Sequence, residues 1–211
     1  MIHHHPDDEL LLAYAGGAAD EALGLIVATH LAYCPACRAG AAKLDAIGGS
    51  LLAGLPPAPL AAGALDAALA KLDQPFERRP RSVSQDGTPG ILRSYIGGDL
   101  RDVRWRQMGP RLSYVSLFRR GAVSARLLRG TPGADSGAHS HEGQEYTVVL
   151  RGGFTDATGN YGPGDLQVMD GGTRHNVVAD PGEDCINLAV TTGKLKFESL
   201  LQRIAAPLFG F

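Results

Sequence analysis

Cysteine is scarce in this chain of 211 residues, and its three cysteines cannot build the disulfide framework of a small secreted domain. No stretch approaches the roughly eighteen continuous apolar residues of a membrane-spanning helix. The chain begins MIHHHP and then three acids, without the basic start and apolar core of a signal peptide. We therefore expect a cytoplasmic protein whose paired thiols bind metal or do redox chemistry.

An excess of charge of either sign is also nearly absent overall, because the net charge is only −2, but the charged residues are unevenly distributed. Residues 1–75 contain three Lys/Arg and eight Asp/Glu, whereas residues 76–136 contain twelve Arg and five acids. An acidic segment is repelled by nucleic acid and attracted to basic protein surfaces. The arginine-rich segment allows a nucleic-acid patch, but we favour solvated strand faces for its arginines, among them Arg101, Arg104, Arg106 and Arg111.

Two kinds of sequence pattern divide the chain. About the first seventy residues predict short helices: one that ends at Gly16-Gly17, one capped by Asp20, one from Pro35 to about Gly48-Gly49, and one over 64–72. Residues 74–90 are rich in Pro, Arg, Ser and Gly, as in a linker. From Ile91 onward, short β-branched or alternating runs are separated by glycines, which indicates a β-sandwich or small barrel. Those runs are 114–118, 125–128, 146–150, 166–169, 176–179 and 185–190. The expected class is α+β in two domains, residues 1–73 helical and residues 91–211 all-β.

The β region contains a pattern of metal ligands. His139 and His141, two residues apart on a strand, project from the same face, and Glu145 keeps that parity. His175, from a later strand, can close the site. Three imidazoles and one carboxylate suit Zn, Fe, Mn or Ni. The alternative is a set of solvated histidines at strand ends.

The helical region contains a second ligand pattern, H-x3-C-x2-C, at His30, Cys34 and Cys37. Pro35 would open the third helix and leave both cysteines at a helix N-terminus, where the helix dipole favours thiolate. A tetrahedral structural zinc needs a fourth ligand, and the remaining histidines are His3, His4 and His5. A helical unit of seventy residues usually needs such a staple. The alternatives are ordinary buried residues beside a histidine tag, and a thioredoxin-like redox pair, which lacks its βαβ context.

The β region resembles the cupin family. G-x5-H-x-H-x3-E-x6-G, from Gly133 to Gly152, matches the first cupin motif at every fixed position. The second motif, G-x5-P-x-G-x2-H-x3-N, is met at Gly164, Gly172 and His175. Asp170 and Ala179 depart from it at positions that are not ligands. The resemblance covers residues 100–195 and implies a small β-barrel or jelly roll.

The combination of both regions is similar to the ChrR family, zinc-binding anti-sigma factors of bacteria. Leu11–Ala15, Val27–Leu31 and Gly143–Glu145 extend the similarity. The resemblance implies a cytoplasmic regulator, not an enzyme, whose helical domain sequesters an extracytoplasmic-function sigma factor. It further implies release on an oxidative signal, singlet oxygen or organic hydroperoxide, transmitted by the cupin, without direct nucleic-acid or membrane binding. Position by position, it implies structural zinc at His5, His30, Cys34 and Cys37. It likewise implies zinc or another divalent transition metal at His139, His141, Glu145 and His175.

Three questions remain open at this level. A cupin site of this type could instead hold Fe(II) and act as a dioxygenase on a small molecule, because fold alone does not define function. Leu65, Leu69 and Leu72 form one helical stripe that could anchor a partner or belong to an internal core. Cys185 could sense oxidant or be an inert buried thiol.

Overall fold

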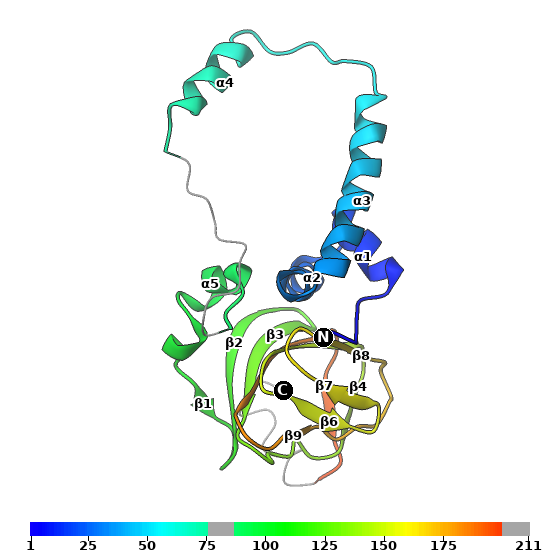
Figure 1. The fold of residues 1–211 in the computed structure, drawn as a ribbon, viewed down its shortest axis with the longest axis vertical. Coiled ribbons are helices and arrows are strands. Elements are labelled where there is room, and N and C mark those ends of the chain that lie inside the picture. The colour runs from blue at the N-terminus through cyan, green and yellow to red at the C-terminus, as the bar shows by residue number, and fades with distance from the viewer. Residues whose placement is uncertain (76–86, 200–211) are drawn as a thin grey trace.

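The computed structural model describes residues 1–75 and 87–199. Three helices, α1 to α3, lie at one end of a β-barrel, and α3 and α4 extend away from it (Figure 1). A short helix, α5, also lies beside the barrel, on the side of α2 away from α1 and α3. The helices are α1 (Asp8–Ala15), α2 (Glu21–Tyr33), α3 (Pro35–Ala53), α4 (Ala64–Leu72), α5 (Gly90–Ile96) and the 3-10 turn η1 (Leu100–Asp102).

Local capping explains where most helices begin. Oδ1 of Asp20 accepts the N–H groups of Ala22 and Leu23, both at 2.9 Å, so α2 starts as predicted. Pro35 occupies the first turn of α3, where an N–H group would have no partner within the helix.

Two expectations about the helices were wrong. Helix α3 continues through Gly48-Gly49 to Ala53, because glycine lowers helix propensity by only about 1 kcal/mol. Residues 91–96, expected to belong to the β region, are part of α5 (Gly90–Ile96).

The β region folds into antiparallel sheets, and each predicted run overlaps a strand. The largest sheet has the order β1-β2-β3-β10-β5-β8, and the two smaller sheets have the orders β11-β4 and β7-β6-β9. The strands are β1 (Arg106–Gln107), β2 (Leu112–Arg120), β3 (Val123–Gly130), β4 (His139–His141), β5 (Glu145–Arg151), β6 (Phe154–Asp156), β7 (Gly159–Tyr161), β8 (Leu166–Met169), β9 (Val178–Ala179), β10 (Cys185–Thr191) and β11 (Leu195–Phe197). All four arginines singled out in the sequence are exposed, but only Arg106 lies on a strand, so the expected place on strand faces was wrong for the other three.

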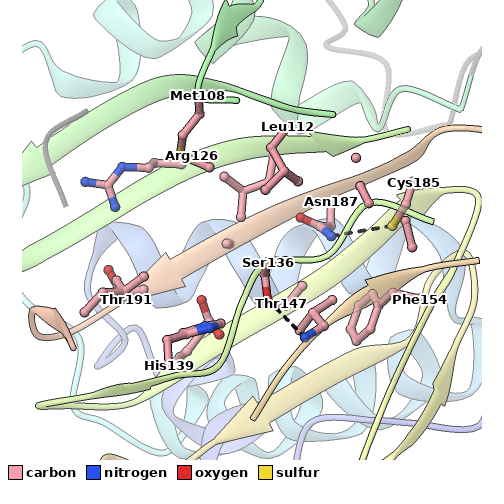
Figure 2. Close-up of a pocket in the computed structure, with 18 of the residues that line it drawn as sticks. Met108, Leu112, Arg126, Ser136, His139, Thr147, Phe154, Cys185, Asn187 and Thr191 are labelled. Carbon is pink, nitrogen blue, oxygen red and sulfur yellow. Dashed lines mark hydrogen bonds between the residues drawn. The ribbon is translucent and has the colours of Figure 1, made fainter. Parts of the chain in front are cut away.

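In the six-stranded sheet, the central strands β5 and β10 are buried on both faces. Along β5, Glu145 and Thr147 line a cavity of about 110 Å³ inside the barrel (Figure 2). The alternate residues, Tyr146 and Val148, belong instead to the hydrophobic core that includes α2. This alternation follows from the two-residue period of a strand. One sheet therefore faces the cavity on one side and the helices on the other.

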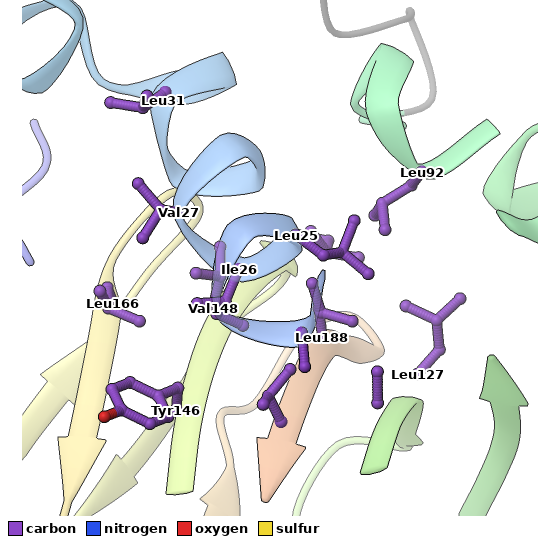
Figure 3. Close-up of a cluster of buried hydrophobic side chains, with 14 of the residues drawn as sticks. Leu25, Ile26, Val27, Leu31, Leu92, Leu127, Tyr146, Val148, Leu166 and Leu188 are labelled. Atoms are coloured by element: carbon purple, nitrogen blue, oxygen red, sulfur yellow. The ribbon is translucent and has the colours of Figure 1, made fainter. Parts of the chain in front are cut away.

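The main core joins the helices to the barrel. Ile26 and Val27 of α2 are fully buried and belong to the same cluster as Val148 of β5 and Leu188 of β10 (Figure 3). Helix α2 has no charged side chain after Glu21, which is typical of a helix covered on more than one side. The domain limits at 1–73, 74–90 and 91–211 stay a prediction, and residues 76–86 of the linker lie outside the described residues.

Replacement of Leu188 tests this shared core. The Leu188→Ala variant removes a fully buried side chain beside α2 and should lower the free energy of unfolding of the whole chain by about 2–5 kcal/mol. Leu12→Ala, at a position 57% exposed on α1, should change it by less than about 0.5 kcal/mol. Urea unfolding followed by circular dichroism measures both. Equal effects of the two substitutions would contradict the packing described here.

Candidate metal centres

The N-terminal ligand group forms where two helices meet. His30 lies in the last turn of α2, Cys34 is the residue between α2 and α3, and Cys37 lies in the first turn of α3. His5 comes from the extended segment before α1, and its Nδ1 lies 3.5 Å from Sγ of Cys34 and 3.3 Å from Sγ of Cys37. One ligand atom from each of the four residues lies within 4.8 Å of the others. Among the three histidines that the sequence left open, the structure brings His5 to the group.

The imidazole of His30 is held in the neutral tautomer that can ligate a metal through Nε2. Its Nδ1–H donates a hydrogen bond of 2.7 Å to the carbonyl oxygen of Gly164, which leaves Nε2 with the lone pair. Nε2 is buried and has no hydrogen-bond partner among residues 1–75 and 87–199. Burial also lowers the pKa of His30, so the imidazole stays neutral. A buried ring nitrogen without a partner fits a metal ligand.

The two thiols also fit a cation. Burial, together with the neighbouring Cys34, raises the pKa of Cys37 to about 11, because two adjacent thiolates repel each other. A divalent ion removes that repulsion. A tetrahedral zinc with bonds of about 2.0 Å to nitrogen and 2.3 Å to sulfur places its ligand atoms about 3.3–3.8 Å apart. The two distances from His5 to sulfur agree with that spacing.

The second group lies inside the barrel. His139 and His141 are on β4, and Glu145 begins β5. His175 is not on the later strand that was expected but in the loop between β8 and β9, bridged to His139 by two backbone hydrogen bonds of 3.1 Å. All four side chains are buried. Nε2 of His141 lies 3.1 Å from Nε2 of His175 and 3.2 Å from Oε2 of Glu145, which lies 3.4 Å from Nε2 of His175. Every sequence-predicted ligand is therefore placed in one of two compact groups.

Further hydrogen bonds orient these imidazoles. Nδ1–H of His139 donates to the carbonyl of Gly137 at 2.8 Å, and Nδ1–H of His175 donates to Oδ2 of Asp156 at 3.4 Å. Both leave Nε2 as the free ligand atom. The Asp156 carboxylate also accepts from Nε2 of Gln167 at 2.7 Å. Sequence analysis missed Asp156 and Gln167, because nothing local links a hairpin residue to a histidine nineteen positions later.

The surroundings of the barrel group favour the protonation states that bind a cation. Burial lowers the pKa of His139, which favours its neutral form. Burial alone would raise the pKa of Glu145, but the hydrogen bond from His141 and the three surrounding histidines hold it below its usual value. A neutral imidazole and an ionised carboxylate are the forms that ligate metal. Three nitrogens and one oxygen suit a borderline transition metal.

Cys185 lines the same cavity as His139 and Glu145, but its thiol is unreactive. Burial raises the pKa of Cys185 to about 12, and 3% of the residue is exposed. Because the thiolate is the nucleophile, a thiol of this kind is inert. Iodoacetamide at pH 8 should modify Cys185 at least about 100-fold more slowly in the folded chain than in urea. Mass spectrometry of the alkylated chain measures the two rates, and equal rates would restore Cys185 as a candidate sensor.

Comparison with known proteins agrees with this arrangement. Residues 94–196 match the family model of the ChrR Cupin-like domain. Over 209 residues, the chain is 42% identical to the anti-sigma-E factor ChrR of Cereibacter sphaeroides, covering 99% of this chain and 98% of that protein. It also resembles a chain in the crystal structure of Rhodobacter sphaeroides SigE in complex with the anti-sigma ChrR, with 41% identity and a TM-score of 0.79. That match covers 90% of this chain and 100% of the other.

These matches confirm several sequence predictions. The α+β class, with N-terminal helices and a cupin-like β region, is confirmed. Both named relatives are regulators, which favours regulation over a cupin dioxygenase. Within the described part of the chain, no helix has the length and apolarity needed to cross a membrane. Because the identity extends over nearly the full length of both proteins, this chain belongs to the ChrR family.

Proposed function

We propose that this chain is an anti-sigma factor whose helices bind an extracytoplasmic-function sigma factor and keep it from RNA polymerase. The observation that supports this most directly is a large apolar surface on α3 and α4, which extend from the body of the molecule (Figure 1). In a family whose named relative was crystallised with SigE, such a surface is best explained by a protein partner.

The apolar surface has two parts. Helix α4 has no buried residue, and Leu65, Leu69 and Leu72 are 66%, 52% and 78% exposed. They follow one face at helical spacing, so they are partner anchors rather than an internal core. The C-terminal half of α3 adds Leu51 and Leu52, each 71% exposed. Two apolar helices joined by a loop can enclose a partner helix or enter grooves on it.

Charge supports the same class of partner. Residues 1–75, which include α1 to α4, have three Lys/Arg against eight Asp/Glu, a balance of −5. A sigma factor must present basic surfaces to DNA, and an acidic competitor is attracted to those surfaces. The apolar surface supplies affinity, and the acidic residues supply steering and selectivity.

We assign structural zinc to His5, His30, Cys34 and Cys37, and zinc or another divalent transition metal to His139, His141, Glu145 and His175. A closed group of two thiolates and two imidazoles supplies folding free energy when zinc is bound. His5 would then tie the N-terminal segment to the junction of α2 and α3. This tie sets the direction in which α3 presents its apolar half.

The barrel group is the proposed receiver of the signal, singlet oxygen or organic hydroperoxide. Its support is that the cavity beside His139 and Glu145 also contains the side chain of Met108, a residue that oxidants convert to a polar sulfoxide. Figure 2 shows Met108 and His139 on opposite sides of that cavity. Oxidation there would change the barrel against which α2 packs.

Co-expression with a sigma factor encoded beside the gene tests the proposal. The two proteins should copurify as a 1:1 complex, and the chain should suppress transcription by polymerase that contains this sigma factor. An unrelated housekeeping sigma factor is the control and should neither copurify nor be inhibited. Failure to bind, together with turnover of a diketone or flavonol by the iron-loaded chain, would replace regulation with the dioxygenase alternative.

A further inference from the structure

One short segment contacts both ligand groups. It consists of the turn 162–165 and the strand β8 (Leu166–Met169), and we call it the coupling segment. Its first half contacts the N-terminal residues and His30, and its second half pairs with β5, which begins at Glu145. Fewer than ten residues therefore connect the two centres through backbone and buried side chains.

The Gly164 carbonyl contacts the N-terminal group directly. It accepts the 2.7 Å hydrogen bond from Nδ1–H of His30 that leaves Nε2 free for the metal. Gly164 has φ +91°, and a Cβ there would lie 2.6 Å from the side chain of Ile2 and 2.7 Å from that of Tyr33. Only glycine allows the barrel backbone to approach His30 so closely.

The Asp165 carboxylate holds the segment that precedes His5. Its Oδ1 accepts the N–H groups of His3 at 2.7 Å and His4 at 2.9 Å, and its Oδ2 accepts that of Gly162 at 2.9 Å. The N–H of Leu166 donates to the His4 carbonyl at 3.1 Å. Asp165 is 3% exposed, so these bonds are shielded from water. They position the residue that follows, His5, beside the cysteines.

The other half of the segment contacts the barrel group. Nε2 of Gln167 donates at 2.7 Å to Oδ2 of Asp156, which in turn lies 3.4 Å from Nδ1 of His175. Met169 pairs with Glu145 across the ladder between β8 and β5. A displacement of β8 would therefore alter the hydrogen bond that orients His175 and the strand that carries Glu145.

We propose that the coupling segment links the metal affinities of the two centres, with Gly164, Asp165 and Gln167 as positioning residues. This inference rests on the proposed function, because both groups must bind metal, and it assigns the route by which the barrel signals to the helices. The element with two arrangements is residues 1–5, which are either docked along β8 or released. Release removes His5 from the cysteines, so metal at either centre favours docking. Such coupling is reciprocal and amounts to about 5- to 150-fold in affinity.

Cobalt(II) titration of the full chain tests this coupling. The thiolate-to-cobalt charge-transfer absorption reports the group with two cysteines, and the barrel group has no thiolate ligand. In the otherwise unchanged chain, Glu145→Gln should weaken cobalt binding at the cysteine group by at least about 5-fold. In an Asp165→Ala background, the same substitution should have no further effect on that absorption, because the link is already broken. Asp45→Asn, on the exposed side of α3, is the matched control and should preserve the coupling.

A second variant keeps the test valid if Asp165→Ala fails to fold. Gln167→Met keeps every N-terminal contact of Asp165 but removes the hydrogen bond to Asp156, and it should also abolish the coupling. If the unchanged chain binds two equivalents of cobalt but Glu145→Gln changes the cysteine group equally in all backgrounds, or in none, the coupling is refuted while both metal centres stand. If the unchanged chain shows no charge-transfer absorption at all, the proposed metal centres fail as well.

Discussion

Cys34→Ser and Cys37→Ser should each weaken sigma-factor binding by at least about 100-fold and remove one equivalent of metal. Structural zinc contributes about 10–16 kcal/mol in zinc-finger peptides at neutral pH, and serine does not provide the thiolate that this requires. Without the metal, the pKa of about 11 for Cys37 disfavours the second thiolate. His5 would then no longer be tied to the junction of α2 and α3.

The structure also predicts which helices keep their position after either cysteine substitution. Helix α2 should stay docked, because Ile26 and Val27 are buried in the core shared with the barrel. Helices α1 and α3, whose buried side chains are few, should lose their fixed arrangement. Titration calorimetry measures the affinity, and hydrogen exchange measures the local loss of order. Cys185→Ser, at the buried thiol of β10, should keep two equivalents of metal. Full-affinity binding by Cys34→Ser would contradict the metal's proposed role.

Charged substitutions on the apolar surface should have the second largest effect. Leu51→Glu and Leu69→Glu should each weaken sigma-factor binding by about 30-fold or more, the effect of losing one anchor residue of about 2 kcal/mol. The melting temperature should change little, because these side chains are 71% and 52% exposed in the free chain.

Position on the helix gives the control for this experiment. Ala67→Glu adds the same charge to α4 on the face opposite Leu65 and Leu69, and it should leave affinity nearly unchanged. Surface plasmon resonance with immobilised sigma factor compares the three variants. Equal losses for Ala67→Glu and Leu69→Glu would indicate a general charge effect, and an unchanged affinity for both leucine variants would exclude this surface.

The sequence predicted which residues gather into the two groups, and where α2 is capped, because those signals are local. The parity of His139, His141 and Glu145, the H-x3-C-x2-C spacing and the cap at Asp20 each extend over a few residues. The choice of His5 over His3 and His4 came only from the family resemblance. It depends on hydrogen bonds that the Asp165 carboxylate accepts from the N–H groups of His3 and His4, 162 and 161 residues earlier in the chain. No pattern within either segment encodes that contact.

The relation between the two halves of the chain was also hidden from sequence analysis. A linker rich in proline and arginine suggested separate domains, yet α2 and the barrel share one core. The long apolar run of α2 was the available signal, since an amphipathic helix of a small independent bundle would have a charged face. Asp156 and Gly164 act through contacts between distant segments, so sequence analysis missed Asp156 and found Gly164 only as a motif glycine, not as the partner of His30.

The metal content of the purified complex with its sigma factor tests the account most directly. Mass spectrometric elemental analysis should find two equivalents of transition metal per 1:1 complex in material that has seen no chelator. The complex of the Glu145→Gln variant should contain one equivalent, and so should the free Cys34→Ser chain, which no longer binds the sigma factor. A tight complex that contains less than one equivalent would contradict the account.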